Sequence, residues 1–254
     1  MENIIRKKAI DIISSSETKV LSSIDDYTNT KITEYRDFVS IVEDMGFMPL
    51  SNNCINFISL DGSSGLTESD LWHTNLPSDP WMWRVQIVQE HKAAYAKLFH
   101  KKPGFISLEW YPKFLAARRK GRTFEEMYSE GFLSNDAKKI YTLFEANEIL
   151  AVHEIKSMAG FTKELNSKYE SAMCELQMGM FITVNGTKQK ISAKGEEYGW
   201  PATAYSTVET WAGDKLIEKA KGIKPKDAMD EILQRIKEIT PHAESAKIKR
   251  FLGF

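Results

Sequence analysis

The residues best suited to chemistry lie in one aromatic-rich stretch in the first half of the chain. They are three tryptophans, a tyrosine and the ionisable side chains among them: Trp72, His73, Asp79, Trp81, Trp83, Arg84, Tyr95 and Lys97. Aromatic rings can stack on an unpaired nucleic-acid base, and His73 or Asp79 could act as a general base. Tryptophans near a helix start more often anchor a core, with Arg84 capping the helix or pairing with a carboxylate. We favour the core interpretation, and both remain open.

Basic side chains form two further clusters. One surrounds His100 to Lys102, and the denser one contains Arg118, Arg119, Lys120 and Arg122. Such clusters could neutralise phosphates in a salt-dependent manner. They are equally typical of a solvated helix end, where positive charge suits the helix dipole. The sequence leaves these two interpretations open.

The composition limits the classes of function. The 34 Lys and Arg residues against 35 Asp and Glu residues give a net charge of -1, so any nucleic-acid interface has to be a local basic patch. Two distant cysteines, Cys54 and Cys174, and five histidines without metal-ligand spacing predict buried thiols and no metal site. The glycine motifs of nucleotide binding and serine hydrolysis are absent, so we expect no cofactor.

No segment predicts export or membrane insertion. The sequence has no run of about 18 apolar residues, which a membrane-spanning helix requires. The first residues, Met1 to Lys8, do not form the apolar stretch of a signal peptide. We therefore predict a cytoplasmic protein with no membrane partner.

The elements that must position these residues begin with two helical regions. Residues 1–30 predict a helical extension through which two copies of the chain could associate, and residues 31–132 predict a helical, aromatic-rich region. The elements expected in this region are a helix from Ile32 that Gly46 ends, a strand over 55–60, a helix from Asp79 towards Leu98, a strand over 105–108, a helix over 112–117 and a helix capped by Thr123. This prediction places Tyr95 and Lys97 on a helix.

Residues 133–212 predict a winged-helix domain. The expected elements are a helix capped by Ser134, an extended run over 149–152, a helix over 153–159, a turn at Gly160 and a helix over 165–178. A β-hairpin over 181–191 follows, with Asn185-Gly186 as its turn, because both central positions of a type I′ turn need positive φ. A third strand over 202–208 completes a small sheet. Three helices followed by a hairpin are the arrangement of a winged helix.

The functional interpretation of this domain places the helix over 165–178 in a major groove and the hairpin along phosphates. The side chains expected to reach DNA are Lys163, Asn166, Ser167, Lys168 and Ser171 near the helix, and Lys188 and Lys190 on the hairpin. Three carboxylates on or beside the same helix, Glu164, Glu170 and Glu175, repel phosphate. A winged helix that binds protein is therefore the alternative.

The last part of the chain, residues 213–254, predicts a partial second helix-turn-helix. An amphipathic helix over 227–240 precedes a second helix over 246–254. All elements together predict a mainly α protein with small β hairpins (α+β), in which a winged helix-turn-helix module belongs to a larger helical body.

The sequence resembles the AlkZ-related proteins of bacteria from about Ile32 to its end. The segments that carry the resemblance are Trp81-Met82-Trp83-Arg84, Tyr95-Ala96-Lys97-Leu98, Phe105-Ile106-Ser107-Leu108 with Pro112, Leu133-Ser134, and Ala172-Met173-Cys174-Glu175-Leu176-Gln177. This group is similar to the AlkZ-type DNA glycosylases, which release alkylated bases and unhook interstrand crosslinks with tandem winged helices. The resemblance implies double-stranded DNA as the partner and DNA repair as the process.

One departure from the glycosylases concerns catalysis. They carry a Gln-x-Gln or Gln-x-Asp pair that positions the attacking water, and Leu71 to Asn75 stand in its place here without such a pair. The resemblance therefore implies a DNA-binding winged-helix protein that lacks the catalytic pair, and it assigns no catalytic residue. An active glycosylase that uses His73 or Asp79 as its base, and a protein-binding scaffold, are the alternatives.

Overall fold

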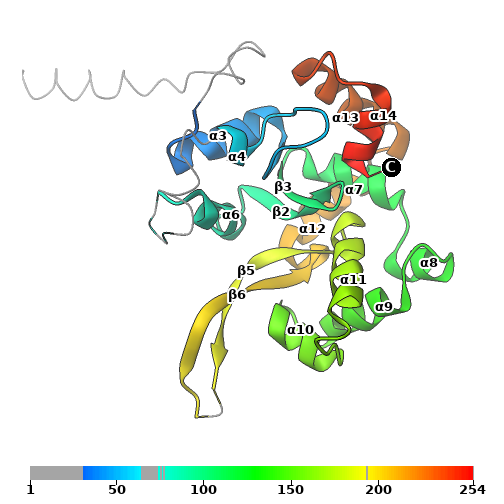
Figure 1. Ribbon diagram of the computed structural model, residues 1–254. Coiled ribbons are helices and arrows are strands. Elements are labelled where there is room, and N and C mark those ends of the chain that lie inside the picture. Colours follow the sequence, from blue (N-terminus) through cyan, green and yellow to red (C-terminus); the bar gives the residue numbers. More distant parts are fainter. Residues whose placement is uncertain (1–30, 64–73, 75, 77, 193, 254) are drawn as a thin grey trace, which may run out of the picture. The chain divides into compact units, whose positions relative to one another are not determined.

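The computed structural model describes residues 31–63, 74, 76, 78–192 and 194–253. The helix predicted over 1–30 and the pocket candidates Trp72 and His73 lie outside these residues. Helices in the described part accompany two small sheets, each of three antiparallel strands (Figure 1). The fold class is α+β, as the sequence predicts. None of the described helices is long and apolar enough to cross a membrane.

The first sheet has the strand order β1-β3-β2, and helices surround it. The elements are α3 (Tyr35–Met45), β1 (Phe47–Pro49), α4 (Leu60–Ser63), α6 (Pro80–Gln89), β2 (Ala93–Phe99), β3 (Lys102–Ser107), α7 (Tyr111–Arg119) and α8 (Phe124–Ser129). Aromatic contacts join α3, α6 and β3: Phe38 stacks on Trp83 at 5.9 Å between ring centroids and meets Phe105 edge-on at 4.9 Å. This aromatic core fixes α6 against the sheet.

Several helix boundaries follow the predicted signals. Gly46, with a φ of 89°, ends α3. Asp79 caps α6 by accepting a hydrogen bond from the backbone N–H two residues on, at 2.8 Å. Thr123 forms a capping box with Glu126 at the start of α8, and Ser134 caps the following helix. Each cap satisfies backbone donors that a helix start leaves without partners.

Two predicted elements in this part are wrong. The strand predicted over 55–60 is a loop that leads into α4. The helix predicted from Asp79 to Leu98 ends at Gln89, because the chain turns at His91 with a left-handed φ of 51° and enters β2. Tyr95 and Lys97 therefore lie on a strand. Both faces of β2 are largely buried, so its sequence is an apolar run without the alternation that identifies a strand.

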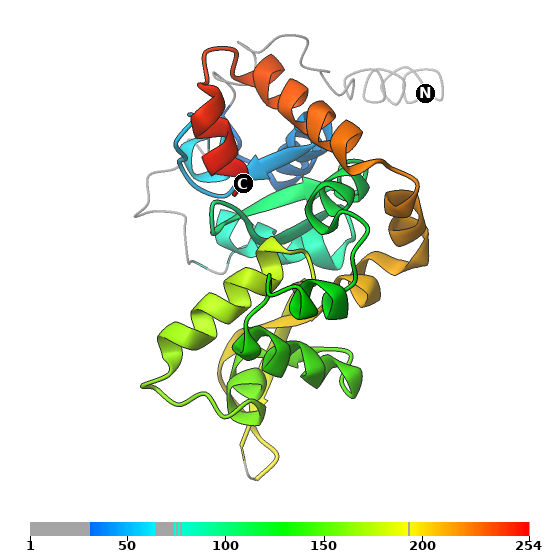
Figure 2. The same cartoon turned by 90° about the vertical axis from the view of Figure 1, so that its right-hand side faces the viewer.

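The second sheet has the order β4-β6-β5 (Figure 2). The elements of this part are α9 (Asn135–Tyr141), the 3-10 helix η1 (Thr142–Glu145), β4 (Leu150–Ala151), α10 (Val152–Met158), α11 (Asn166–Met178), β5 (Ile182–Ile191) and β6 (Glu197–Thr207). Helices α9, α10 and α11 precede a two-stranded ribbon, which is the order that the sequence led us to expect. The assignment as a winged helix remains a prediction.

The hairpin predicted over 181–191 is wrong. Asn185 and Gly186 lie inside β5, where the register with β6 shifts, and the chain turns back only after Ile191. Gly186 has a φ of 122°, and the side chain of Gln89 on α6 lies 3.1 Å from the place that a Cβ would take there. The glycine therefore serves a bulge and the close approach of α6, which local turn rules do not reveal.

The C-terminal helices pack on the first part of the chain. They are α12 (Val208–Lys221), α13 (Pro225–Ile239) and α14 (Ser245–Leu252). Helices α12 and α13 contact α7, and α14 contacts β2. Phe251 of α14 stacks on Phe99 of β2 at 4.9 Å between ring centroids. This packing makes α14 part of the surface beside the first sheet, and a partial second helix-turn-helix in 213–254 remains a prediction.

Gly46 provides a test of the packing at the end of α3. A Cβ at this position would lie 2.5 Å from the Trp110 ring, at a φ of 89°. We expect Gly46→Ala to lower the free energy of unfolding by about 3 kcal/mol, because left-handed strain adds to overpacking. Gly121→Ala is the matched control, since its φ is 75° but nothing lies within 4 Å of its Cβ. It should cost about 1 kcal/mol. Equal losses in urea unfolding would contradict the packing of Trp110.

Candidate functional site

Helix α11 divides cleanly into a buried and an exposed face. Tyr169, Met173 and Leu176 are buried in the core beneath it. The side chains that the sequence predicts to reach DNA, Lys163, Asn166, Ser167, Lys168 and Ser171, are all exposed. This division follows the helical period, so the predicted contact residues share one accessible surface at the N-terminal end of α11.

The carboxylates beside this surface are held by local partners. Glu170 forms a salt bridge with Lys97 of β2 at 3.0 Å, and Glu175 accepts hydrogen bonds from the backbone N–H and the hydroxyl of Ser134, both at 2.7 Å. A hydrogen bond from the neighbouring Thr162 hydroxyl lowers the pKa of Glu164. The salt bridge offsets the charge of Glu170, and Glu175 points towards the start of α9.

Hydrogen bonds join β2 to the second part of the chain. The side-chain oxygen of Gln177 accepts from the backbone N–H of Lys97 at 2.9 Å, and the Thr183 hydroxyl donates to the carbonyl of Tyr95 at 3.3 Å. Gln177 and Thr183 are buried polar residues that the sequence prediction did not single out. The sequence does contain a signal for them, since each is a polar residue among apolar residues. A polar residue buried in such a place is nearly always hydrogen-bonded, so a partner could have been expected.

The aromatic stretch splits into a core part and a partly exposed part. Trp83 and Asp79 are fully buried, the first in the aromatic core and the second as the cap of α6. The guanidinium of Arg84 lies 3.7 Å from the Trp81 ring centroid and 6.0 Å from that of Tyr95. Burial lowers the pKa of Arg84 and raises that of Tyr95. Trp81, Arg84 and Tyr95 therefore form one cluster, and Lys97 turns instead to Glu170.

The basic cluster after residue 117 serves mainly to join parts of the fold. Arg118 is 7% exposed, and its guanidinium donates to the carbonyls of Leu98 and Met178. Arg119 donates to the carbonyl of Met180 and pairs with Glu209.

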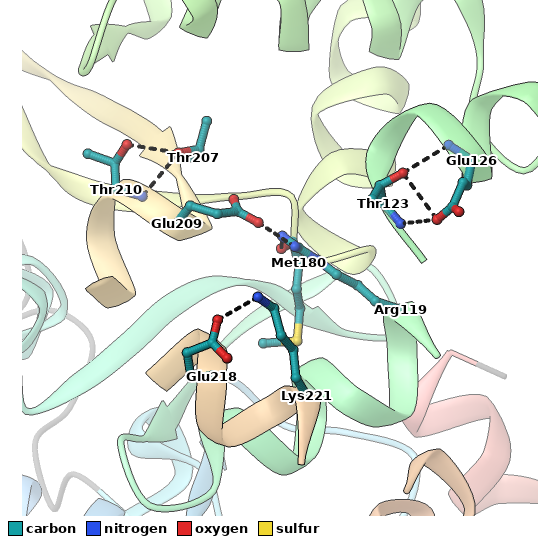
Figure 3. Close-up of polar contacts among 9 residues, drawn as sticks. All are labelled: Arg119, Thr123, Glu126, Met180, Thr207, Glu209, Thr210, Glu218 and Lys221. Carbon is teal, nitrogen blue, oxygen red and sulfur yellow. Dashed lines mark hydrogen bonds and ion pairs between the residues drawn. The ribbon is translucent and has the colours of Figure 1, made fainter. Parts of the chain in front are cut away.

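Figure 3 shows Arg119 extending from α7 to the carbonyl of Met180 and the carboxylate of Glu209. Arg122 pairs with Glu130 at 2.6 Å. Lys120 is exposed and makes no salt bridge within the part of the chain that the structure describes. We therefore retain only Lys120 from this cluster as a candidate for phosphate contact.

A groove of about 1090 Å³ runs along α11 on the side of α14. Its walls come from β2 and the following turn, α11, and α14 with the residue after it: Lys97, His100, Lys101, Glu170, Ser171, Cys174, Glu175, Met178, Ala246, Lys249, Arg250 and Gly253. Arg250 donates to the Nε2 atom of His100 at 3.3 Å. Lys101, Lys249 and Arg250 form no salt bridge among the described residues, so the groove carries an excess of positive charge.

The turn between β2 and β3 is conformationally strained. His100 and Lys101 have φ values of 47° and 65°, a region that side chains other than glycine and asparagine rarely adopt. A two-residue turn of this kind ordinarily uses Asn-Gly. The fold therefore holds His100 and the cationic Lys101 in the lining of the groove despite a local cost. Within the described residues, no group of three or more His, Cys, Asp or Glu side chains could hold a metal ion.

A comparison with family models identifies one family. A family model described as "AlkZ related" matches residues 32–253. The solved structure of the Streptomyces sahachiroi DNA glycosylase AlkZ is similar to this chain with a TM-score of 0.39 and 8% identity, covering 70% of this chain and 52% of that one. The chain thus spans about half the length of that glycosylase. The curated proteins contain no match.

Proposed function

The chain belongs to the AlkZ-related family, and on that premise we propose that it binds double-stranded DNA with residues 133–212 acting as a winged-helix domain. In this proposal the exposed face of α11 reads the major groove, and the β5–β6 ribbon follows the phosphates. The observation that carries the proposal is the exposed surface at the start of α11, where Lys163 of the preceding turn and Lys168 of the helix lie with three small polar side chains.

The surroundings of α11 support the same interpretation. The groove towards α14 adds Lys101, Lys249 and Arg250 on one side of the helix. On the other side the ribbon contributes Lys190, whereas Lys188 is engaged with Glu154 of α10 at 2.6 Å. A protein with a net charge of -1 that concentrates cations around one helix creates the local patch that a phosphate backbone requires.

We propose further that this DNA binding is not coupled to base removal. Asp79, one of the two predicted bases, is fully buried and caps α6, so it has no access to a substrate. The other, His73, lies outside the described residues, as does most of the segment that stands in place of the catalytic pair. An active glycosylase is the second candidate. The partly exposed Trp81, with Arg84 packed on its ring, favours it as a platform for a flipped base.

Binding of a labelled duplex to the full chain tests the proposed function. We expect binding that weakens about 40-fold between about 50 and about 200 mM salt, as three phosphate contacts imply. Absence of binding at the lower salt concentration, or binding that salt leaves unchanged, would overturn the proposal. Incubation with alkylated duplex in the same buffer tests the second candidate. Release of free base that is lost in His73→Ala would show that the chain is an active glycosylase.

A further inference from the structure

The outer part of the β5–β6 ribbon exposes large apolar side chains. Trp200 is 76% exposed, Tyr198 53% and Ile191 57%. A solvent-exposed tryptophan leaves much apolar surface in water. Trp200 and Tyr198 lie two positions apart on β6, and neighbouring exposed apolar residues mark a binding surface more often than isolated ones do. Because most of the surface of each side chain is exposed, packing within the described part of the chain does not account for these residues.

A bulge in β6 presents Trp200 to solvent. Lys188 pairs with Ala202 and Lys190 with Tyr198, so three residues of β6 oppose the single residue Gln189 of β5. The side-chain amide of Gln189 donates to the carbonyl of Tyr198 at 3.1 Å and to the next carbonyl, that of Gly199, at 2.8 Å. These bonds hold the bulge in a defined shape and occupy carbonyls that the ladder has lost.

The residues on either side of Trp200 suit this shape. Gly199 has a φ of 67°, which a residue with a side chain rarely adopts. Pro201 has no backbone N–H to donate, so its position in a bulge sacrifices no hydrogen bond between the strands. The sequence Gly199-Trp200-Pro201 thus places a tryptophan where the strand interrupts its pairing, and the backbone on both sides is chemically adapted to that interruption.

Helix α10 connects this ribbon to the N-terminal end of α11. Glu154 of α10 binds Lys188 of β5 at 2.6 Å, and Lys156, two positions further along α10, donates to Asn166 at 2.7 Å. Figures 1 and 2 show the ribbon extending on the side where α11 begins. A duplex that lies against the exposed face of α11 therefore meets the ribbon as well.

The charges on the ribbon favour nucleic acid over protein as the occupant. Paired residues of an antiparallel ribbon share a face, so Lys188 and Lys190 lie on the face of Tyr198, whereas Glu197 lies opposite Ile191 on the other face. An aromatic residue beside lysines can stack on bases while the lysines approach phosphates. The strands themselves carry no carboxylate over residues 188–190 and 198–202, and Glu154 of α10 pairs with Lys188, which leaves Lys190 to meet a phosphate.

We propose that Trp200 is a wedge that inserts between the bases of the duplex bound by α11. This inference rests on the proposed DNA binding and assigns a specific contact within it. Apolar side chains on elements that enter a groove commonly unstack a base step in this way. The bulge clamped by Gln189 presents the indole to solvent, and Lys190 on the paired strand lies ready to meet a flanking phosphate.

The test compares Trp200→Ala with wild type in the full chain, by fluorescence anisotropy of a labelled duplex at several salt concentrations. The indole carries no charge and its insertion releases no counterions from the phosphates. We therefore expect affinity to fall about tenfold at every salt concentration, with an unchanged slope of log affinity against log salt. A duplex that contains 2-aminopurine should brighten on binding wild type and should not brighten with Trp200→Ala. Gln189→Ala should lose part of the affinity, because the bulge loses its clamp.

Lys190→Ala on the paired strand is the matched control, and it should reduce the salt slope by about one. Equal affinity and equal 2-aminopurine signal for wild type and Trp200→Ala would overturn the wedge while leaving the proposed function intact. Failure of wild type to bind duplex would instead overturn the proposed function. If sedimentation showed that Trp200→Ala separates a wild-type dimer into monomers without changing DNA affinity, the tryptophan would serve a second copy of the chain and the wedge would be wrong.

Discussion

Arg118→Met will lower the free energy of unfolding by about 3 kcal/mol, because it removes the hydrogen bonds to two carbonyls, one buried and one part-buried, and leaves nothing to replace the charged donor. The guanidinium of Arg118 now donates to Leu98 of β2 and to Met178 at the end of α11. Methionine matches the arginine side chain as far as Nε and retains the packing of the aliphatic stem, but it donates no hydrogen bond. Urea unfolding monitored by circular dichroism measures the loss, with the midpoint and the slope compared to wild type.

The charge of Arg118 does not cancel this expectation. Burial lowers its pKa to about 10, so the side chain is protonated at neutral pH and its hydrogen bonds are charge-assisted. Lys120→Met is the matched control. Lys120 lies two positions after Arg118 and is exposed, so the substitution removes the same charge from a side chain that is in solvent. It should change stability by less than about 0.5 kcal/mol. A stability gain in Arg118→Met, as occurs at some buried ion pairs, would contradict the structural role assigned here.

Reversing the two lysines at the N-terminal end of α11 will weaken duplex binding about 100-fold. Lys163→Glu combined with Lys168→Glu replaces two exposed cations by anions on the face proposed to meet the phosphates. Each reversal removes an attraction and adds a repulsion, and a factor of about ten per position corresponds to 1.4 kcal/mol. Anisotropy at about 50 mM salt measures the change. Both lysines are exposed, so we expect the two substitutions to change the free energy of unfolding no more than surface substitutions usually do, by about 0.5 kcal/mol each.

The matched control for this pair lies on another helix. Lys219→Glu with Lys221→Glu on α12 makes the same change in net charge at two exposed positions. We expect it to weaken binding by less than about threefold, through long-range repulsion alone. A control that weakens binding as much as the α11 pair would show that only the net charge matters. An α11 pair that binds like wild type would remove α11 from the proposed interface.

Local sequence signals predicted most helix boundaries correctly. Gly46, Asp79, Thr123 and Ser134 act at the helix ends where their chemistry places them. The division of α11 into buried and exposed faces also follows from its sequence, because the helical period alone determines which side chains share a face. These features depend on residues within a few positions of one another.

The wrong predictions concern segments whose environment comes from distant residues. β2 was predicted as helix because burial on both faces removed its alternation, and that burial is created by α11, α6 and β5. Asn185-Gly186 satisfies the rules of a hairpin turn, yet β6 pairs on both sides of it and Gln89 packs against the glycine. Local preference gave way in both places to contacts with elements far along the chain.

The aromatic and basic residues show the same division between what local sequence determines and what distant contacts decide. Their types determined what they could do: tryptophans could stack or fill a core, and arginines could meet phosphates or carbonyls. Only the tertiary structure decided between these uses, since it buried Trp83 and Asp79 and placed Arg118 between β2 and α11. It left Trp81 partly exposed and displayed Trp200 on a bulge. Side-chain chemistry belongs to the residue, whereas desolvation and the available partners depend on how distant segments pack.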